Sequence, residues 1–422
     1  MLSVGAGLAS LPFGRSLAFA GETAGIEGQW PTVTAFLDKY VVEKKVAGMV
    51  AALGWGRAAP GYIVRGKEGF DDPDANGANS LFRTYSMTKP VTGMAAMMLI
   101  DQGKLKLDQK LADFFPEFAR MSVALDPSKG LDARPAKTQI TIRHLLTHTA
   151  GFGYAGVNQD KVSQELRRLG VSPASVTRMV LPGITDGQPT PAAEEFMRRA
   201  ASVPLLAEPG TAWRYSMSLD ILGIVIARVA GTATLAEFLA ERMFGPAGMT
   251  SSYFQVPGSE VGRLTTNYGI LGGNPVPLDP AASSVYLDKP AFAFGGAGLV
   301  TTPADYDRFL SMVANGGVVG GNRVMSRAAI RLGTSDLLPK GTDIKGTYID
   351  GAKFGAGGRV GVGPTAGTFG WSGAAGTVGF ANTRTGLRAG LFVQYTPSNV
   401  LPIQKDFPGA VLADLAAKRK RG

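Results

Sequence analysis

Strand-like segments stand at both ends of this chain with a long helical stretch between them, and this order limits the possible folds more than any other feature. Residues 46–66 predict two short strands joined by a Pro/Gly turn, and the sequence becomes Gly-rich and strand-like again from about residue 292. Helical signals dominate from about 86 to 250. We therefore predict one α/β domain from residues 27–85 and 290–422, with a mainly helical region over 86–289 inserted between its two parts.

The C-terminal strand-like part contains one helix with clear boundary signals. Thr302 is a good N-cap residue, Pro303 suits the first helical position and Asp305 places an acid in the first turn, so a helix is predicted over 303–314. Further on, residues 368–381 and 387–396 predict two consecutive strands around a turn at 383–386.

The chain has no cysteine and only two histidines, which excludes disulfides, thiolate catalysis, Fe–S clusters and cysteine zinc sites. Any Ser-His-Asp triad or imidazole metal site must use His144 or His148. Their i, i+4 spacing matches helical zinc pairs, but the Glu that follows the first His of such pairs is absent. We expect both histidines to be structural, and we predict no metal and no cofactor.

Charge and composition narrow the possible partners. The chain has 422 residues, and 43 Lys and Arg against 33 Asp and Glu give a net charge of +10. The basic residues are spread out apart from a tail at 418–421, which we expect to be solvated. No zinc-finger or RNA-binding motif accompanies them, so nucleic acid is not a predicted partner. Hydrophobic residues make up 45% of the chain, enough for a sizeable core, and the sequence leaves the oligomeric state open.

The N-terminal 20 residues resemble a targeting segment. Residues 2–14 are small, apolar and uncharged, and Ala18-Phe19-Ala20 fits the small-x-small cleavage rule. We therefore expect export to the periplasm or the medium, although the basic n-region is missing and an apolar N-terminal tail is the alternative. No apolar run reaches the ~18 residues of a membrane span, so we predict no integral membrane segment.

Ser86 and Lys89 form the sharpest local pattern, in a segment that reads YSMTKP before a predicted apolar helix over 91–100. Two residues three apart on a helix share a face, with Cβ atoms ~5–6 Å apart. Pro90 is tolerated only near a helix start, which places Ser86 where free N–H groups can stabilise an oxyanion. This is the Ser-x-x-Lys arrangement of serine acyl enzymes, although an ordinary helix start with an exposed Ser and Lys can also produce it.

Two further segments have the chemistry of a site. Tyr215 lies in the segment 213–220, WRYSMSLD, before a predicted helix over 219–229. A phenol beside a lysine can share a proton and act as a base, and a packing tyrosine is the alternative. The segment 369–377 reads FGWSGAAGT and is strand-like. Its small residues would let a substrate lie against the strand edge with backbone N–H groups facing its carbonyl; a glycine-weakened edge strand is the alternative.

Ser372 is a competing nucleophile, because the residues around it lack only the last Gly of a Gly-x-Ser-x-Gly elbow. That elbow needs a strand, a sharp turn and then a helix. Here a Gly-rich strand follows, and no histidine lies downstream. We therefore do not expect Ser372 to be the nucleophile.

The three segments occur in the order found in the serine β-lactamase and penicillin-binding protein superfamily. Longer stretches strengthen the likeness: GKLKLD at 103–108, IRHLLTHTAGF at 142–152, EPGT at 208–211 and GGAGLVTTPAD at 295–305. Over about residues 30–397 the chain resembles the class C β-lactamase branch, most of all the family VIII carboxylesterases. The resemblance implies a serine β-lactamase-like fold, with an antiparallel sheet flanked by helices and an inserted, mainly helical domain.

The resemblance also implies a role for each matching residue. Ser86 would be the acylated nucleophile, Lys89 its proton partner and Tyr215 the general base. The oxyanion hole would use the backbone N–H groups of Ser86 and Ala374. The substrate would lie against Tyr85, Met217, Trp371, Ser372 and Gly373.

Two departures from the β-lactamase pattern favour ester substrates. Trp371 stands where β-lactamases and peptidases commonly carry a lysine that holds a substrate carboxylate, and Met217 stands where they carry an asparagine. Losing both polar anchors favours esters with short-to-medium apolar acyl groups over acidic amides. The expected function is therefore a serine carboxylesterase acting on small-molecule esters. A β-lactamase, a D-Ala-D-Ala carboxypeptidase, an acyltransferase and a non-catalytic binding protein remain as alternatives.

Overall fold

The computed structural model describes residues 25–421, with side chains described up to residue 418. The predicted leader at 1–20, with its Ala18-Phe19-Ala20 site, lies outside the described residues. Within the described range, no single helix has the length and apolar character of a membrane span.

An antiparallel sheet joins the two ends of the described chain. Within residues 25–421 it has seven strands in the order β12-β13-β14-β15-β16-β1-β2. From one edge to the other these are β12 (Lys353–Phe354), β13 (Arg359–Val360), β14 (Thr368–Ser372), β15 (Val378–Asn382), β16 (Leu387–Phe392), β1 (Gly48–Trp55) and β2 (Gly61–Gly66). The predicted strand pair at 46–66 is confirmed as β1 and β2, and the sheet with its flanking helices confirms the expected fold class.

Helices cover the sheet and fill the stretch between its two parts. They are α1 (Ile26–Gln29), α2 (Pro31–Val42), α3 (Thr88–Asp101), α4 (Ile142–Leu146), α5 (Lys161–Arg168), α6 (Ala193–Ala201), α7 (Ser218–Ala230), α8 (Leu235–Leu239), α9 (Gly245–Ala247), α10 (Pro303–Ala314), α11 (Arg327–Gly333) and α12 (Ile403–Arg421). The helix predicted over 303–314 is confirmed as α10, and the Thr302 side chain accepts a hydrogen bond from the Asp305 N–H as its cap.

Strand β1 shows how the sheet forms two cores, because successive side chains of a strand point to opposite faces. Val50 and Ala52 pack with α10, whereas Met49, Ala51 and Leu53 pack with α2 and α12. All of β1 except its last residue is therefore buried, which fits its continuous apolar sequence.

Short strands connect the sheet to the helical part. Two small sheets have three strands each: β3 (Phe82–Arg83), β9 (Val300–Thr301) and β6 (Ser252–Tyr253) form one, and β17 (Tyr395–Thr396), β7 (Asn267–Leu271) and β8 (Asn274–Asp279) form the other. Two strand pairs are β4 (Ser122–Ala124) with β5 (Ala133–Pro135), and β10 (Val318–Val319) with β11 (Asn322–Arg323). Strand β3 leads directly into the Ser86 segment and pairs with β9.

One predicted strand is wrong: residues 368–381 form two strands, β14 and β15, separated by a turn at 373–377. The glycines of this segment explain the break. Gly376 has a φ of +87°, which is easy only for glycine, and its N–H closes the turn onto the Gly373 carbonyl at 3.0 Å. Because of this turn, Ala374 lies in a loop beyond the end of β14 and not within a strand.

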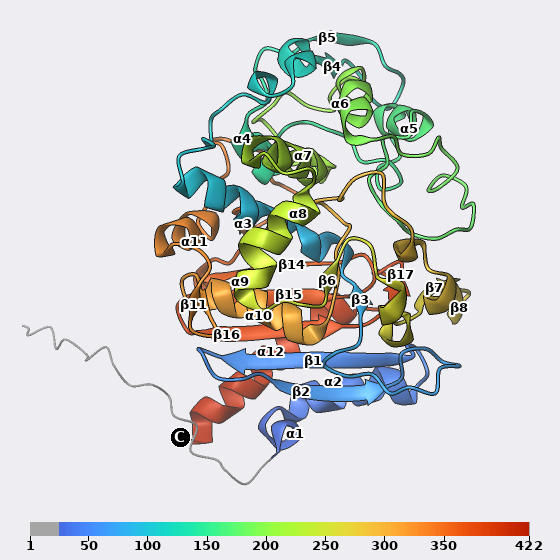
Figure 1. Cartoon of the computed structure of the whole chain (residues 1–422), viewed down its shortest axis with the longest axis vertical. Helices are drawn as coiled ribbons and strands as arrows, with labels where there is room; N and C mark the ends of the chain where they lie inside the picture. Colours follow the sequence, from blue (N-terminus) through green and yellow to red (C-terminus); the bar gives the residue numbers. More distant parts are fainter. Residues whose placement is uncertain (1–24, 422) are drawn as a thin grey trace, which may run out of the picture.

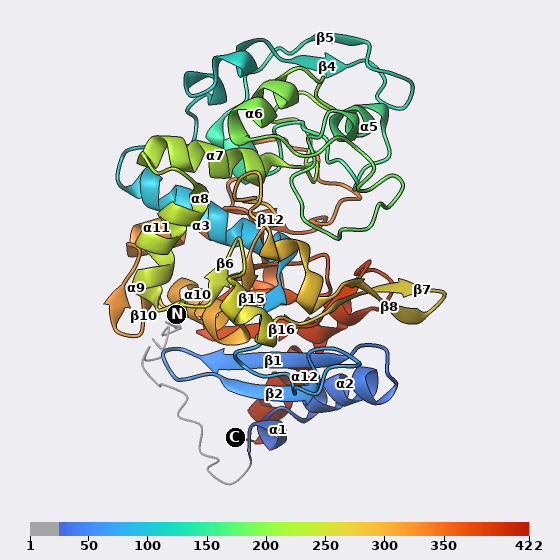
Figure 2. The ribbon, with the colours of Figure 1, turned by 45° about the vertical axis from the view of Figure 1, so that its right-hand side comes forward.

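Helix α3 lies between the sheet and the helical end of the molecule. Figures 1 and 2 show α4, α5, α6 and α7 gathered at one end, and β1, β2, α2 and α12 at the other. Helix α3 packs against α7 and α11, and the turn before it contacts β14. The start of α3 is therefore the point where residues from α7, β14 and the helical part can meet.

Candidate active site

Ser86 sits in a single 3₁₀ turn, Tyr85–Met87, immediately before α3. Tyr85 has a φ of +40°, a conformation that costs a bulky residue energy and persists only when its surroundings hold it. Its buried ring and the Thr88 hydroxyl, which donates to the Tyr85 carbonyl at 2.5 Å, hold it there. The result is a half-buried Ser86 that lines a large pocket.

Lys89 lies beneath Ser86 and is completely buried. Its Nζ donates to the Ser86 Oγ at 3.0 Å and to the Gly296 carbonyl at 2.8 Å. The same nitrogen lies 4.6 Å from the centroid of the Tyr215 ring and 5.3 Å from that of Tyr154. The Lys89 Nζ therefore has the Ser86 hydroxyl on one side and the faces of two aromatic rings on others.

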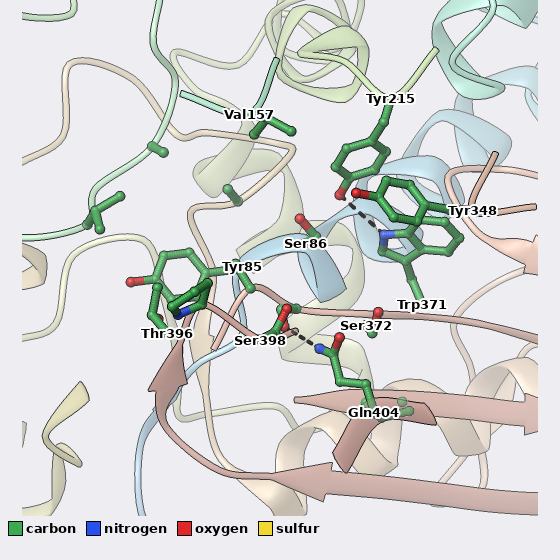
Figure 3. A pocket seen from close by; sticks show the side chains of 18 of the residues that line it. Tyr85, Ser86, Val157, Tyr215, Tyr348, Trp371, Ser372, Thr396, Ser398 and Gln404 are labelled. Atoms are coloured by element: carbon green, nitrogen blue, oxygen red, sulfur yellow. Dashed lines mark hydrogen bonds between the residues drawn. The ribbon is translucent and has the colours of Figure 1, made fainter. Parts of the chain in front are cut away.

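Tyr215 is the third predicted residue that the structure brings to the pocket. Its hydroxyl accepts a hydrogen bond from the Trp371 indole N–H at 3.3 Å, and the two rings stack with centroids 5.9 Å apart. Figure 3 shows this bond beside Ser86, and the Tyr348 ring lies 5.8 Å from the Tyr215 ring, between centroids. Lys89 lies against the face of the Tyr215 ring, and the indole N–H is the donor that reaches the phenol oxygen.

His148 holds the backbone on both sides of Tyr215. Its carbonyl accepts the Arg214 N–H at 2.8 Å, and its Nδ1 accepts the Ser216 N–H at 3.3 Å. The imidazole is completely buried, and burial together with the positive charge of Lys89 keeps the pKa of His148 well below its usual value. A neutral ring with Nδ1 as acceptor therefore positions Tyr215, a role that the sequence did not reveal.

Asp220 is a second group that sequence reasoning missed. Its Oδ1 accepts the Gly296 N–H at 2.7 Å, and the carbonyl of Gly296 in turn accepts from Lys89. Burial raises the pKa of the Asp220 carboxyl to about 7, although Lys89 and the Gly296 N–H act in the opposite direction. Asp220 therefore fixes the backbone that holds Lys89. An acid in the first turn of α7 was the available signal, but such an acid is ordinarily a surface residue.

Ala374, the second residue of the predicted oxyanion hole, lies in the turn at 373–377. Within the described residues, the N–H groups of Ser86 and Ala374 have no hydrogen-bond partner, and both residues line the pocket. The Gln404 side chain of α12 steadies the turn by donating to the carbonyls of Gly373 at 2.5 Å and Thr377 at 3.1 Å. Two free N–H groups beside a serine are the chemistry that an oxyanion requires.

Met217 does not reach the substrate pocket, contrary to the expectation from the sequence. It is the residue before α7, is completely buried in the main core and does not line the pocket. Tyr85, Trp371, Ser372 and Gly373 do line it. Because Ser372 lies on the α12 side of β14, its side chain stands apart from Tyr215 (Figure 3).

The pocket has a volume of about 1270 Å³ and is walled mainly by neutral groups. Segments 154–157 and 172–190 form one wall, with exposed apolar side chains that include Val157 and Ile184. The charged residues that line it are Asp288, Lys289 and Arg359. Within residues 25–421, no three His, Cys, Asp or Glu side chains gather closely enough to hold a metal ion.

His144 gives a first testable prediction. It is buried in a capping box, where its Nδ1 accepts the Thr141 N–H at 3.2 Å, and burial lowers the pKa of His144 to about 4. The unfolded chain binds a proton here below its ordinary pKa of 6.5 and the folded chain does not, so this group lowers stability as pH falls from about 6.5 to 4.

The His144→Gln variant keeps a side-chain acceptor at the usual capping-box position but cannot titrate. We expect it to lose less stability on acidification than the wild type, by on the order of 2–3 kcal/mol between pH 7 and pH 4.5. Urea unfolding of both proteins at the two pH values measures this difference. Equal losses in both proteins would contradict the prediction.

Comparison with known proteins identifies the family of this chain. The Beta-lactamase family model matches residues 33–411. Protein Rv1367c of Mycobacterium tuberculosis is 32% identical over 351 residues, covering 78% of this chain and 82% of that protein. Esterase EstB of Burkholderia gladioli is 31% identical over 303 residues, covering 66% of this chain and 68% of that enzyme.

A solved structure extends the likeness to the fold. The structure of EstCE1, described as a hydrolase with promiscuous acyltransferase activity, superposes with a TM-score of 0.74 at 22% identity, covering 92% of this chain and 98% of that one. The family model spans most of the chain, and EstB exceeds 30% identity over two thirds of its length. The chain therefore belongs to the Beta-lactamase family.

Proposed function

We propose that this protein is a serine carboxylesterase that cleaves its substrate through an acyl group on Ser86. The observation that carries the proposal is the 3.0 Å hydrogen bond from the Lys89 Nζ to the Ser86 Oγ at the floor of a large pocket. A serine hydroxyl is a weak nucleophile until an adjacent base takes its proton, so this contact is where activation would occur.

In the proposed reaction, Tyr215, assisted by Lys89, accepts the Ser86 proton as the Oγ attacks the ester carbonyl. The N–H groups of Ser86 and Ala374 stabilise the oxyanion. The C–O bond to the alcohol then breaks, the proton passes to the leaving alkoxide, and the acyl group stays on Ser86. Water, losing a proton to the same base, attacks the acyl-enzyme and releases the carboxylic acid and free Ser86.

The chemistry of the walls supports esters over anionic substrates. Trp371 presents an indole where a carboxylate-binding lysine would stand, and its N–H is already used by Tyr215. Most of the wall around Ser86 is apolar or uncharged. At the position of Trp371, a substrate carboxylate would therefore lose hydration without gaining the cationic partner that a lysine there would supply. The similarity to the esterase EstB favours the same substrate class.

Acyl transfer is the second candidate, because an alcohol can replace water in the last step. The size of the pocket, about 1270 Å³, leaves room for an acceptor beside the acyl-enzyme. The acyltransferase activity named for EstCE1 favours the same possibility. Measuring transfer from p-nitrophenyl butyrate to an added alcohol separates the two reactions.

Covalent trapping tests the proposed function directly. We expect an alkyl p-nitrophenyl phosphonate to label Ser86, seen by peptide mass spectrometry, and to abolish p-nitrophenyl butyrate hydrolysis in proportion to labelling. Nitrocefin hydrolysis, measured alongside, should be much slower than ester hydrolysis. Labelling at another residue, or faster turnover of nitrocefin, would contradict the esterase assignment.

A further inference from the structure

The pocket does not end at Ser86 but continues along helix α12 over the outer face of the sheet. Six apolar side chains line this extension: Trp55, Phe380, Leu387, Pro408, Leu412 and Leu415. We call it the α12 groove. It begins at Gln404 (labelled in Figure 3), which bonds to the carbonyl of Gly373, one residue from Ala374 of the proposed oxyanion hole.

Helix α12 has more apolar surface than its own packing requires. Ile403, Phe407 and Val411 are completely buried and form the part of α12 that packs in the core with β1 and α2. Pro408, Leu412 and Leu415 line the pocket. Pro408 and Leu415 are half-buried, and Leu415 also packs against this core, whereas Leu412 is 50% exposed. The apolar surface that these three residues leave accessible in the pocket can be covered by an apolar ligand.

Side chains on one face of β14 and β15 form the floor of the groove. Gly370 and Ser372 of β14 stand opposite Phe380 and Val378 of β15, and Val378 packs in the core that contains α12. Among the described residues, those that α12, β14, β15, β16 and β1 contribute to the pocket lining are all uncharged. The distance from Gln404 to Leu415 along the helix is about 16 Å, at 1.5 Å per residue.

We propose that the α12 groove binds a linear alkyl chain of an ester substrate, a specificity that rests on the proposed esterase function. The groove is long, is lined by apolar side chains and belongs to the same pocket as Ser86. This shape suits a flexible alkyl chain better than a compact ring. Each methylene that leaves water in the groove adds to transition-state binding. The chain can be the acyl group or the alcohol group of the ester.

Two ester series test the proposal and identify the chain. We expect kcat/KM to rise about tenfold or more from p-nitrophenyl butyrate to p-nitrophenyl dodecanoate if the groove holds the acyl chain. The rise should instead occur from butyl butyrate to dodecyl butyrate if it holds the alcohol chain. Rates that are independent of chain length in both series would overturn the proposal.

The Leu412→Glu variant places a charge in the groove at a half-exposed position that should not disturb folding. It should lower kcat/KM about tenfold or more for the preferred long ester and change p-nitrophenyl butyrate hydrolysis less than twofold. The matched control is Leu271→Glu, at a 66% exposed residue of β7 that does not line the pocket. Equal effects of the two variants on kcat/KM for the long ester would contradict alkyl-chain binding in the α12 groove.

Binding without turnover separates this inference from the proposed function. Titration calorimetry of the Ser86→Ala variant with 1-decanol, a neutral chain, should show binding that the additional Leu412→Glu change removes. Decanol binding without ester hydrolysis by the wild type would support the alkyl-binding groove and contradict the esterase function. Ester hydrolysis without decanol binding would support the esterase function and contradict the alkyl-binding groove.

Discussion

Replacing Ser86 by Ala should reduce kcat for p-nitrophenyl butyrate by at least about 10⁴-fold, because it removes the hydroxyl that the Lys89 Nζ contacts at 3.0 Å. The substitution removes one oxygen atom from a half-buried side chain. The fold should therefore be retained, with a thermal midpoint close to that of the wild type. Burst and steady-state release of p-nitrophenol measure the loss, and the burst should disappear together with turnover.

Ser372→Ala is the matched control for this prediction. It removes the same atom from a second serine of the same pocket, on the α12 side of β14. We expect less than a tenfold change in kcat. Should Ser86→Ala stay active while Ser372→Ala loses the burst, the Ser-x-x-Lys assignment is wrong and Ser372 is the nucleophile.

The parts of the site that could be predicted from the sequence are those fixed by local geometry. Ser86 and Lys89 are three residues apart, and Pro90 sets the helix start, so their contact follows from helix periodicity alone. The cap at Thr302 and the strand pair at 46–66 are likewise local signals. The prediction that Tyr215 and Trp371 lie beside Ser86 came from the family resemblance and not from their spacing in the sequence.

The parts that could not be predicted depend on contacts between distant segments or on one turn. The glycines at 373–377 suit a weak strand and a turn equally well, and only the pairing of β14 with β15 decides between them. Met217 was placed in the pocket by its position in the motif, whereas the packing of α7 buries it. His148 and Asp220 act through Ser216 and Gly296, which lie 68 and 76 residues away in the chain.

Tyr215→Phe should reduce kcat for p-nitrophenyl butyrate by about 10²- to 10⁴-fold, the range expected when a general base is removed. The phenyl ring keeps the stack on Trp371 and the contact with the Lys89 ammonium, so the variant isolates the hydroxyl. KM should change little, because the hydroxyl is proposed to act on the proton and not on the substrate. The phosphonate should label Ser86 of this variant more slowly by a similar factor.

Trp371→Phe separates proton transfer by Tyr215 from simple packing. It keeps an aromatic ring beside Tyr215 but removes the N–H that donates to the Tyr215 oxygen at 3.3 Å. The phenol that is proposed to take the proton is kept, so kcat for p-nitrophenyl butyrate should fall less in Trp371→Phe than in Tyr215→Phe. Steady-state kinetics of the two variants under the same conditions measure this difference. A Tyr215→Phe enzyme that keeps as much activity as Trp371→Phe would show that Tyr215 only packs.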